Sequence, residues 1–412
     1  MKILFLTQWC QPEPFFKGIP FAKALQSKGH EVDILTGFPN YPGGKLYPGY
    51  KIRLFQREII DGIPVNRTAL YPSHDQSGFH RILNYMSFAF SAAFIGHFLV
   101  KKPDLIYVYN LITLDLAAQL LKKRYDCPVI YDIQDIWPDS VSDSGMMKPS
   151  ALLKLLSWWC QSVYRRASHI ITLSPGFKKE LMKRGVPEKN ISVIYNWYNW
   201  ADESNINLSK HDEEKIPHFQ DKNNFIVMFA GTMGVMQGLN SVLDAAEKLM
   251  TIAPRIKFIF IGGGIERERL KINAVDRSLH NVVFLERQPP EKINAILQKA
   301  DVLLVTLKDI PLFRITVPSK IQAYMANGKP ILLGVHGDSA DIIRKSKGGI
   351  VVKPENSDSI AQGVLKLYEM NEEERRLMGD NAKKYYQEYL SMDAGVRNFE
   401  RIFYNSLKYY KI

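Results

Sequence analysis

The chain has 412 residues, of which 46% are hydrophobic and 23% charged. This is the composition of a folded protein, and the length predicts about two or three domains rather than one ordinary core. The formal net charge of +12 favours anionic partners: nucleic acid, phosphate-bearing metabolites or an anionic membrane surface. Its three cysteines are scattered without a CxxC pair, which argues against a disulfide framework or a zinc site and favours a reducing cytosol.

The N-terminal stretch and one apolar window bear on membranes. Residues 1–6, MKILFL, are too short for the apolar core of a signal peptide and lead into a strand-like pattern, so we expect no signal peptide. Residues 82–100 are nearly long enough to span a bilayer, but they carry Asn84, His97 and several serines. We expect a buried or membrane-surface helix there, with a spanning helix as the alternative.

Short apolar runs alternate with amphipathic helical stretches over the first 200 residues. Continuous apolar strands, each followed by a helix, predict a parallel sheet with right-handed crossovers. The strands expected here are residues 3–7, 31–36, 105–109, 129–132, 170–173 and 192–194.

The polar, non-periodic residues 201–224 are typical of a linker or a long surface loop. The alternation then restarts and predicts a second sheet of similar size, wound like a nucleotide-binding unit, with a cleft between the two sheets as the expected active site. Residues 372–410 have a helical pattern rich in Tyr, Phe and Lys. The strands expected in the second sheet are residues 226–229, 257–261, 282–285, 302–306, 331–333 and 350–352.

Two glycine-rich loops follow strands of the second sheet. In FAGTMGVMQGLNSVLDAA, residues 229–246, Gly231 and Gly238 let the backbone approach a phosphate held by the amides of the next helix. The loop is neither GxGxxG nor a Walker sequence, so a tight strand-to-helix turn is the alternative. FIGGGIERERL, residues 260–270, has Gly263 in a run of three glycines, which favours a close ligand or a strained turn over plain packing.

A third loop at the same sheet edge, TVPSKIQAYMANGKPIL, residues 316–332, places Ser319 and Lys320 at a helix start. The helix dipole disfavours a cation there unless an anion binds at the same end. Lys320 can set its charge on a diphosphate, and a solvated lysine is the alternative. Because three such loops share one edge, we expect the second domain to bind a nucleotide diphosphate.

Three carboxylates, Asp132, Asp135 and Asp139, follow the strand expected at residues 129–132. Acids at the carboxyl end of a strand can act as a base, an orienting group or a metal ligand. Asp139 could equally cap a helix, so Asp132 and Asp135 are the better candidates for chemistry. A buried structural carboxylate remains the alternative for each of them.

The loops after the first two strands could face the expected cleft. Their Pro, Gly and Tyr residues indicate loops whose aromatic rings could stack on a sugar or on lipid, with simple loop packing as the alternative. The candidates in these loops are Glu13, Lys17, Gly18 and Asn40, which become acceptor-side candidates through the family resemblance given below.

Two basic and aromatic segments, residues 152–166 and 404–412, could lie on an anionic membrane or form ordinary domain surface. The sequence has no zinc knuckle, ribonucleoprotein motif or recognition-helix pattern, so we expect no nucleic-acid partner.

The two α/β domains, the Gly loop that opens the second, ALQSKGHEVDILT and YMANGKPIL resemble glycosyltransferase family 4, which has the GT-B fold. LTGFPNYPGGKLYPGY, YDIQDIWPDS and VPSKIQAYMANGKP resemble more narrowly the WbuB-like O-antigen and capsule transferases. The resemblance covers nearly the whole chain. It implies an acceptor domain over residues 1–200, a donor domain over 225–385, and a C-terminal helix over 386–412 that returns to the first domain.

The resemblance also implies an activity. It implies transfer of an N-acetylated deoxyhexosamine, with L-FucNAc as the best guess, from UDP to an undecaprenyl-diphosphate-linked sugar. It implies retention at the anomeric carbon, no metal and no cofactor, and a cytoplasmic enzyme held peripherally on the inner face of the membrane. In such enzymes basic side chains and helix amides stabilise the leaving diphosphate.

The sequence departs from the family pattern at several donor positions. Thr232 and Gln237 stand where the family usually has Arg and Lys, and Ile315 and Ala323 stand where it has two Glu residues. Gln134 replaces the usual His before Asp135. We therefore hypothesise that Lys320 replaces the missing basic clamp. Two further donor-side candidates without an assigned role, Glu286 and Arg287, follow the strand expected at residues 282–285.

Two other functions stay open. A GT-B epimerase acting on a UDP-sugar would use paired acids near the sugar and would need no acceptor. A non-catalytic nucleotide-sugar-binding partner would explain the missing family residues, although the intact Gly loops and the acid-rich strand argue against it.

Overall fold

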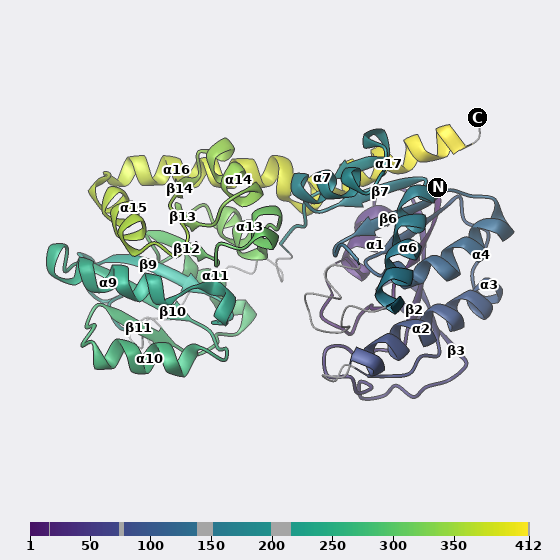
Figure 1. Cartoon of the computed structure of the whole chain (residues 1–412), viewed down its shortest axis with the longest axis horizontal. Helices are drawn as coiled ribbons and strands as arrows, with labels where there is room; N and C mark the ends of the chain where they lie inside the picture. The colour runs from purple at the N-terminus through teal and green to yellow at the C-terminus, as the bar shows by residue number, and fades with distance from the viewer. Residues whose placement is uncertain (16, 74–77, 138–150, 199–215, 411–412) are drawn as a thin grey trace. The chain divides into compact units, whose positions relative to one another are not determined.

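The computed structural model describes residues 1–15, 17–73, 78–137, 151–198 and 216–410 (Figure 1). The chain forms two compact units: Met1–Tyr195 together with Gly395–Ile412, and Asn196–Ala394. Most of the expected linker, residues 201–215, lies outside the described residues. Each unit is built on one sheet covered by helices.

The first unit contains an eight-stranded sheet of order β3-β4-β2-β1-β5-β6-β7-β8. The chain order reverses between β1 and β5, and such a switch point is where open α/β sheets bind ligands. The strands are β1 (Lys2–Leu6), β2 (Glu31–Gly37), β3 (Phe55–Ile60), β4 (Ile63–Thr68), β5 (Leu105–Tyr109), β6 (Val129–Ile133), β7 (His169–Thr172) and β8 (Ile191–Val193).

The hairpin β3–β4 differs from the expected all-parallel sheet, because β3 pairs with β4 antiparallel. Its turn is Asp61-Gly62, and both residues have positive φ, 49° and 81°. Asp-Gly is the residue pair that such two-residue hairpin turns favour, so the local sequence does carry the signal. The other neighbouring strands of this sheet run parallel.

The second unit contains a six-stranded parallel sheet of order β11-β10-β9-β12-β13-β14, with its switch point between β9 and β12. Its strands are β9 (Phe225–Ala230), β10 (Ile256–Ile261), β11 (Val282–Leu285), β12 (Val302–Thr306), β13 (Ile331–Gly334) and β14 (Gly349–Val351). These boundaries agree with the sequence expectation to within about one residue, because uninterrupted apolar runs mark buried parallel strands.

Helices join the strands. In the first unit they are α1 (Ile19–Gln26), α2 (Gly78–Phe94), α3 (Gly96–Leu99), η1 (Ile112–Leu114), α4 (Asp115–Tyr125), α6 (Ala151–Arg166), α7 (Pro175–Lys183) and η2 (Glu188–Asn190). In the second they are η3 (Val235–Gln237), α9 (Asn240–Ile252), α10 (Arg267–Asp276), α11 (Pro290–Leu297), α12 (Pro311–Ile315), α13 (Ser319–Ala326), α14 (Asp338–Ser346), α15 (Ser357–Glu369), α16 (Glu372–Tyr385) and the π-helix η4 (Tyr386–Leu390). None of the helices in the described ranges is both long and apolar enough to cross a membrane.

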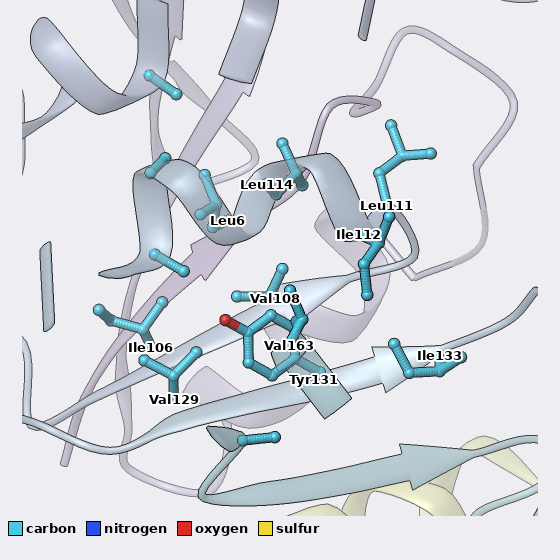
Figure 2. Packing of buried hydrophobic residues seen from close by; sticks show 14 of the residues in the cluster. Leu6, Ile106, Val108, Leu111, Ile112, Leu114, Val129, Tyr131, Ile133 and Val163 are labelled. Carbon is cyan, nitrogen blue, oxygen red and sulfur yellow. The ribbon is translucent and has the colours of Figure 1, made fainter. Parts of the chain in front are cut away.

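The core of the first unit lies between its sheet and the helices α2, α4 and α6. Val108, Tyr131 and Val163 meet there with the aliphatic side chains of the neighbouring strands (Figure 2). On the other face, Phe399 of the last helix α17 (Met392–Tyr410) packs 4.8 Å from the ring of Phe21 in α1. The α/β architecture with two Rossmann-like sheets and a C-terminal helix on the first unit is therefore confirmed.

Candidate active site

Lys320 lies in the first turn of α13, with its side chain against the loop after β9. Its Nζ donates to Gln237 Oε1 at 2.9 Å and lies 3.6 Å from the centre of the Phe229 ring. Among the described residues no carboxylate forms an ion pair with it, and burial alone lowers its pKa to about 7. A desolvated ammonium without a carboxylate beside it is suited to take an anionic ligand.

The glycines around Lys320 are required by close contacts. Gly231 has φ +139°, and a Cβ there would lie 2.5 Å from Lys320 Cε. A Cβ on Gly262 would meet the carbonyl of Gly231, and one on Gly264 would meet the carbonyl of Met233. A Cβ on Gly263, the candidate in this loop, would have nothing within 4 Å. The flanking glycines therefore build the turn, while Gly263 borders open space.

The β9 loop is fixed at the switch point of the second sheet. The Thr306 hydroxyl at the end of β12 donates to the carbonyl of Gln237, and the Lys308 amide donates to the Met236 carbonyl at 2.9 Å. Gly238 closes η3 in the left-handed conformation, with φ +62°. Thr232 is exposed at the tip of the same loop. Gln237, Gly238 and Lys320 are thus brought together.

Ser319 is exposed, and Pro318 is the N-cap residue of α13 without a side-chain capping bond. In the first turn of α13 the Ile321 amide donates to the Pro318 carbonyl at 3.0 Å, and no side chain of the N-cap residue meets the amides of Ser319 and Lys320. Glu286 and Arg287 are both exposed after β11, the edge strand. Glu286 forms an ion pair with Arg267 at 2.6 Å, so its carboxylate has a cationic partner of its own.

Two carboxylates beside the β9 loop were missed from the sequence. Glu355 Oε2 accepts from the Asp309 amide at 2.9 Å, and its Cγ lies 3.4 Å from the position that a Gly238 Cβ would take. Asp309 follows β12 and forms an ion pair with Arg314 at 3.1 Å, which lowers its pKa. The rule that acids after strand ends matter could have found Asp309, whereas no local pattern marks Glu355.

At the carboxyl edge of the first sheet, Asp132 is buried. Its Oδ2 accepts from Lys17 Nζ at 2.7 Å and from the Tyr107 hydroxyl at 2.6 Å, and its Oδ1 accepts from Gln134. The side chains of Asp132 and Lys17 are both 0% exposed. These contacts support the structural alternative for Asp132 and place Lys17 inside the unit rather than facing an acceptor. A catalytic role for Asp132 stays a prediction.

Asp135 reaches the surface three residues later. The surrounding protein partly desolvates its carboxylate and raises its pKa. It lies close enough to Tyr85 and Tyr109 to influence their pKa values, and neighbouring rings form an aromatic wall, defined here as Trp9, Tyr41, Tyr85 and Trp137. Trp9, Tyr85 and Trp137 are buried in the core and Tyr41 is half-buried, so the aromatic wall supports the loops beside the exposed Asp135. Asp139 lies outside the described residues.

Glu13 and Asn40 hold loops together. Glu13 is 1% exposed and accepts from the backbone amides of Cys10, Asn40 and Tyr41 at 2.8–2.9 Å, and burial raises its pKa to about 7. Asn40 is also buried, at 2% exposed. The expectation that these two side chains face an acceptor differs from the structure, because both are buried and the Glu13 carboxylate accepts hydrogen bonds from backbone amides of the loops. A Cβ on Gly18 would meet the side-chain amide of Gln11.

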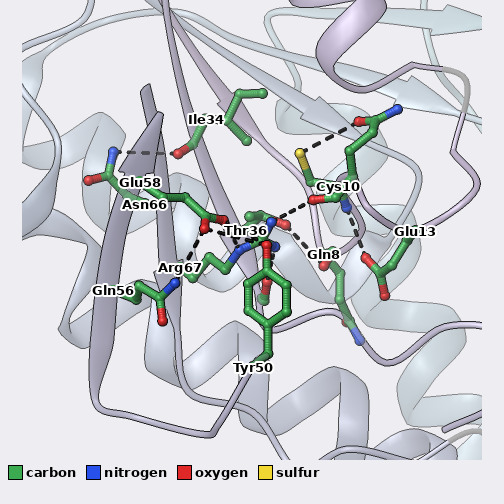
Figure 3. Close-up of polar contacts among 12 residues, drawn as sticks. Gln8, Cys10, Glu13, Ile34, Thr36, Tyr50, Gln56, Glu58, Asn66 and Arg67 are labelled. Atoms are coloured by element: carbon green, nitrogen blue, oxygen red, sulfur yellow. Dashed lines mark hydrogen bonds and ion pairs between the residues drawn. The ribbon is translucent and has the colours of Figure 1, made fainter. Parts of the chain in front are cut away.

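Arg67 of β4 fixes the same region and was not found from the sequence (Figure 3). Its fully buried guanidinium donates to Glu58 at 2.5 Å, to the Gly37 carbonyl at 2.8 Å and to the Gln11 carbonyl at 2.5 Å. It therefore ties the hairpin to the loops after β1 and β2, so that the aromatic wall rests on a rigid base.

No group of three or more His, Cys, Asp or Glu side chains suited to hold a metal ion occurs within the described ranges. The expectation of metal-independent chemistry stays a prediction.

Known proteins resemble both units. Residues 20–197 match the family described as glycosyl transferase 4-like domain, and residues 210–385 match glycosyl transferases group 1. A putative colanic acid biosynthesis glycosyl transferase, WcaI of Escherichia coli K12, is 25% identical over 348 residues, 82% of this chain and 84% of that protein. The O-antigen chain mannosyltransferase C of Escherichia coli is 25% identical over 188 residues, 45% of this chain and 48% of that protein.

Among solved structures, that of HepE from Anabaena in complex with UDP superimposes with a TM-score of 0.68 at 17% identity, covering 98% of this chain and 100% of that one. This similarity confirms the fold. The two family matches adjoin one another and together span most of the chain, so the protein belongs to the glycosyltransferases, with a 4-like domain followed by a group 1 domain.

Proposed function

We propose that the protein transfers a sugar from UDP to a lipid-linked saccharide during polysaccharide assembly. The observation that carries the proposal is the ammonium of Lys320, which lies against Gly231 at the switch point of the second sheet without a carboxylate partner in the described structure. The names of the relatives, colanic acid and O-antigen transferases, support a polysaccharide product. The UDP held by HepE supports the nucleotide.

In this proposal Lys320 and the first amides of α13 hold the donor diphosphate. Negative charge grows on the diphosphate as the bond to the sugar breaks, and a preorganised cation in a desolvated site stabilises that charge. The amides of Ser319 and Lys320 at the uncapped start of α13 would donate to the same anion, whereas the amides of Gly231 and Met233 are already bonded to the carbonyls of Ile261 and Gly263. This arrangement replaces both the missing family cations at Thr232 and Gln237 and a metal ion.

Asp135 is the acceptor-side carboxylate of the proposal. It is exposed, its pKa is raised, and it lies beside the aromatic wall. A carboxylate in this position can accept a hydrogen bond from the acceptor hydroxyl, and the aromatic wall, whose rings are largely buried, supports the loops around it. Asp132 then acts as a positioning residue, because its contacts with Lys17 and Gln134 fix the end of β6 from which Asp135 projects.

The finer assignments follow the WbuB-like motifs. We propose L-FucNAc as the donor sugar, transferred with retention to an undecaprenyl-diphosphate-linked saccharide by an enzyme held peripherally on the inner face of the cytoplasmic membrane. The distinction between fucosamine and related sugars depends on one hydroxyl or its stereochemistry, which a few polar contacts decide.

The test is an assay of the purified full chain, in EDTA, with a panel of UDP-N-acetyl sugars and a synthetic lipid-diphosphate-GlcNAc, read by mass spectrometry. A new disaccharide from one donor would support the reaction, the donor and metal independence together. A changed sugar in the acceptor-free control would show an epimerase instead. If no donor reacts and UDP does not bind, the proposal is wrong.

A further inference from the structure

Helix α2 exposes an apolar face. The side chains of α2 that are exposed within the described structure are Phe79, Leu83, Phe90 and Phe94, and the short helix α3 continues the series with Phe98. Phe79 and Phe98 are 71% exposed and Phe94 is 61% exposed, so large rings stand in water. A surface helix normally presents polar side chains on this face, and contiguous exposed apolar patches mark interaction sites.

The spacing of these residues makes a continuous stripe. Steps of three, four and seven residues return to the same side of a helix, and α2 alone is about 26 Å long. Figure 1 shows α2 and α3 end to end along the first unit. The opposite side of α2 carries Tyr85, Phe88 and Ala92, which are buried in the core. The exposed stripe is therefore additional to the face that holds the helix in place.

The hairpin strand β3 extends the stripe. Arg57 donates to the backbone carbonyls of Phe98 and Leu99 at 3.4 and 3.2 Å, so the outer side of β3 lies beside α3. Alternate residues of a strand share a side, which places Phe55 and Ile59 with Arg57. Phe55 is 48% and Ile59 75% exposed. We call the stripe of α2 and α3 together with Phe55 and Ile59 the apolar surface.

Positive charge borders the apolar surface. Residues 78–102 contain Arg81, Lys101 and Lys102 and no Asp or Glu, and residues 51–57 add Lys51, Arg53 and Arg57. Exposed rings flanked by Lys and Arg are the combination that binds an anionic lipid surface, since the rings enter the acyl boundary and the cations meet the headgroups. A protein partner would require an acidic, apolar complement, and the net charge of +12 makes association between two copies of this basic surface unfavourable.

We propose that the apolar surface docks the first unit on an anionic lipid bilayer, as a monotopic contact formed by α2, α3 and β3. The inference rests on the proposed function, because it supplies the route to a lipid-linked acceptor. Tyr85 projects from the inner side of α2 into the aromatic wall, so one helix joins the membrane contact to the acceptor side of the site. This surface includes residues 82–100, for which a membrane-surface helix was one of the sequence expectations. It differs from the other two expected segments, 152–166 and 404–412, although Leu155 and Trp158 of α6 are also exposed.

The test is cosedimentation of the purified full chain with vesicles of phosphatidylcholine, with and without phosphatidylglycerol, at low and high salt. The wild type should bind the anionic vesicles and should lose affinity with salt. The affinity of the triple variant Phe90→Ser, Phe94→Ser, Phe98→Ser for these vesicles should fall by about tenfold or more, because three rings no longer enter the bilayer. The matched control is Ile265→Ser, Ile272→Ser, Val275→Ser, which removes three exposed apolar side chains from the second unit and should bind as the wild type does.

Three results would overturn the proposal: no vesicle binding by the wild type, equal binding by wild type and Phe variant, or equal losses in both triple variants. A wild-type dimer in sedimentation velocity that only the Phe variant abolishes would also overturn it, since the surface would then be a contact between copies. Binding of UDP measured on the same preparations separates this inference from the proposed function. UDP binding without vesicle binding rejects the docking surface alone, and vesicle binding without UDP binding rejects the donor site alone.

Discussion

Each sheet has a lysine at its carboxyl edge, Lys17 fully buried and Lys320 partly buried, and the two lysines have opposite surroundings. Lys17 is 0% exposed and ion-paired with Asp132 at 2.7 Å, within reach also of the rings of Tyr109 and Phe399. Lys320 contacts a neutral amide and one ring, and burial lowers its pKa to about 7. A buried cation beside a carboxylate is part of the structure, whereas a buried cation that lacks one costs stability and is retained where a ligand supplies the negative charge.

The largest expected effect separates the two lysines by stability. Lys17→Met leaves the carboxylate of Asp132 buried without its cation, so the free energy of unfolding should fall by about 3–5 kcal/mol. Lys320→Met removes a charge that the fold disfavours and should leave the free energy of unfolding unchanged or raise it. Urea unfolding followed by circular dichroism measures both. Equal losses in the two variants would contradict the comparison.

The next effect separates them by activity. Lys320→Ala should lower kcat by about 10²–10³-fold at saturating donor, as expected for the loss of one preorganised group that stabilises developing charge. Lys320→Arg should keep part of the activity because the charge remains. The matched control is Lys329→Ala: Lys329 is another partly buried lysine with a lowered pKa, and it precedes β13 at the opposite edge of the sheet. Normal turnover of Lys320→Ala would reject the assignment.

A smaller effect concerns the uptake of a proton when the donor binds. Burial lowers the pKa of Lys320 to about 7, so at pH 8 most molecules carry the neutral amine, and a bound diphosphate should raise that pKa again. Binding of a UDP-sugar at pH 8 should therefore take up nearly one proton, and less at pH 6, where Lys320 is already protonated. Calorimetry in buffers of different ionisation enthalpy measures this uptake. Lys320→Met should abolish it, and uptake that survives the substitution would point to another group.

The smallest effect distinguishes glycines of the same site. Gly231→Ala places a methyl group 2.5 Å from Lys320 Cε at a φ of +139°, so it should displace the lysine and weaken UDP binding by about tenfold, within the 1–3 kcal/mol typical of such strain. Gly263→Ala meets nothing within 4 Å and should leave the thermal unfolding midpoint unchanged. A lower midpoint for Gly263→Ala than for Gly231→Ala would show that the loop is held differently.

Local sequence patterns were enough to predict the strands and loops of the second unit. The strands around the β9 loop are continuous apolar runs. Gly231 and Lys320 were each predicted as site residues from a local pattern of loop and helix, within residues 229–246 and 316–332. Such signals depend on backbone geometry and helix polarity, which short segments carry by themselves. The Asp61-Gly62 turn is an equally local signal for the β3–β4 hairpin, although the sequence analysis expected an all-parallel sheet without that hairpin.

The candidate residues of the first unit could not be assigned from the sequence, because their surroundings depend on contacts between residues that are far apart in the chain. Lys17 and Asp132 are 115 residues apart in the chain, and their pairing supports the structural alternative for Asp132 and places Lys17 inside the unit. Glu13 likewise appeared suited to an acceptor until its three amide partners, two of them in the loop after β2, were placed around it.

The sequence by itself determined two α/β sheets, their glycine loops and the unusual lysine of α13, because each is encoded in the order of neighbouring residues. It also marked residues 82–100 as an apolar helix at a surface or in a core. Only the tertiary structure decided which side of that helix is buried and which is exposed: packing against the sheet buries Phe88 and leaves Phe90 and Phe94 exposed to water. Burial and charge pairing are properties of the assembled chain, and they assign each side chain to the fold or to a partner.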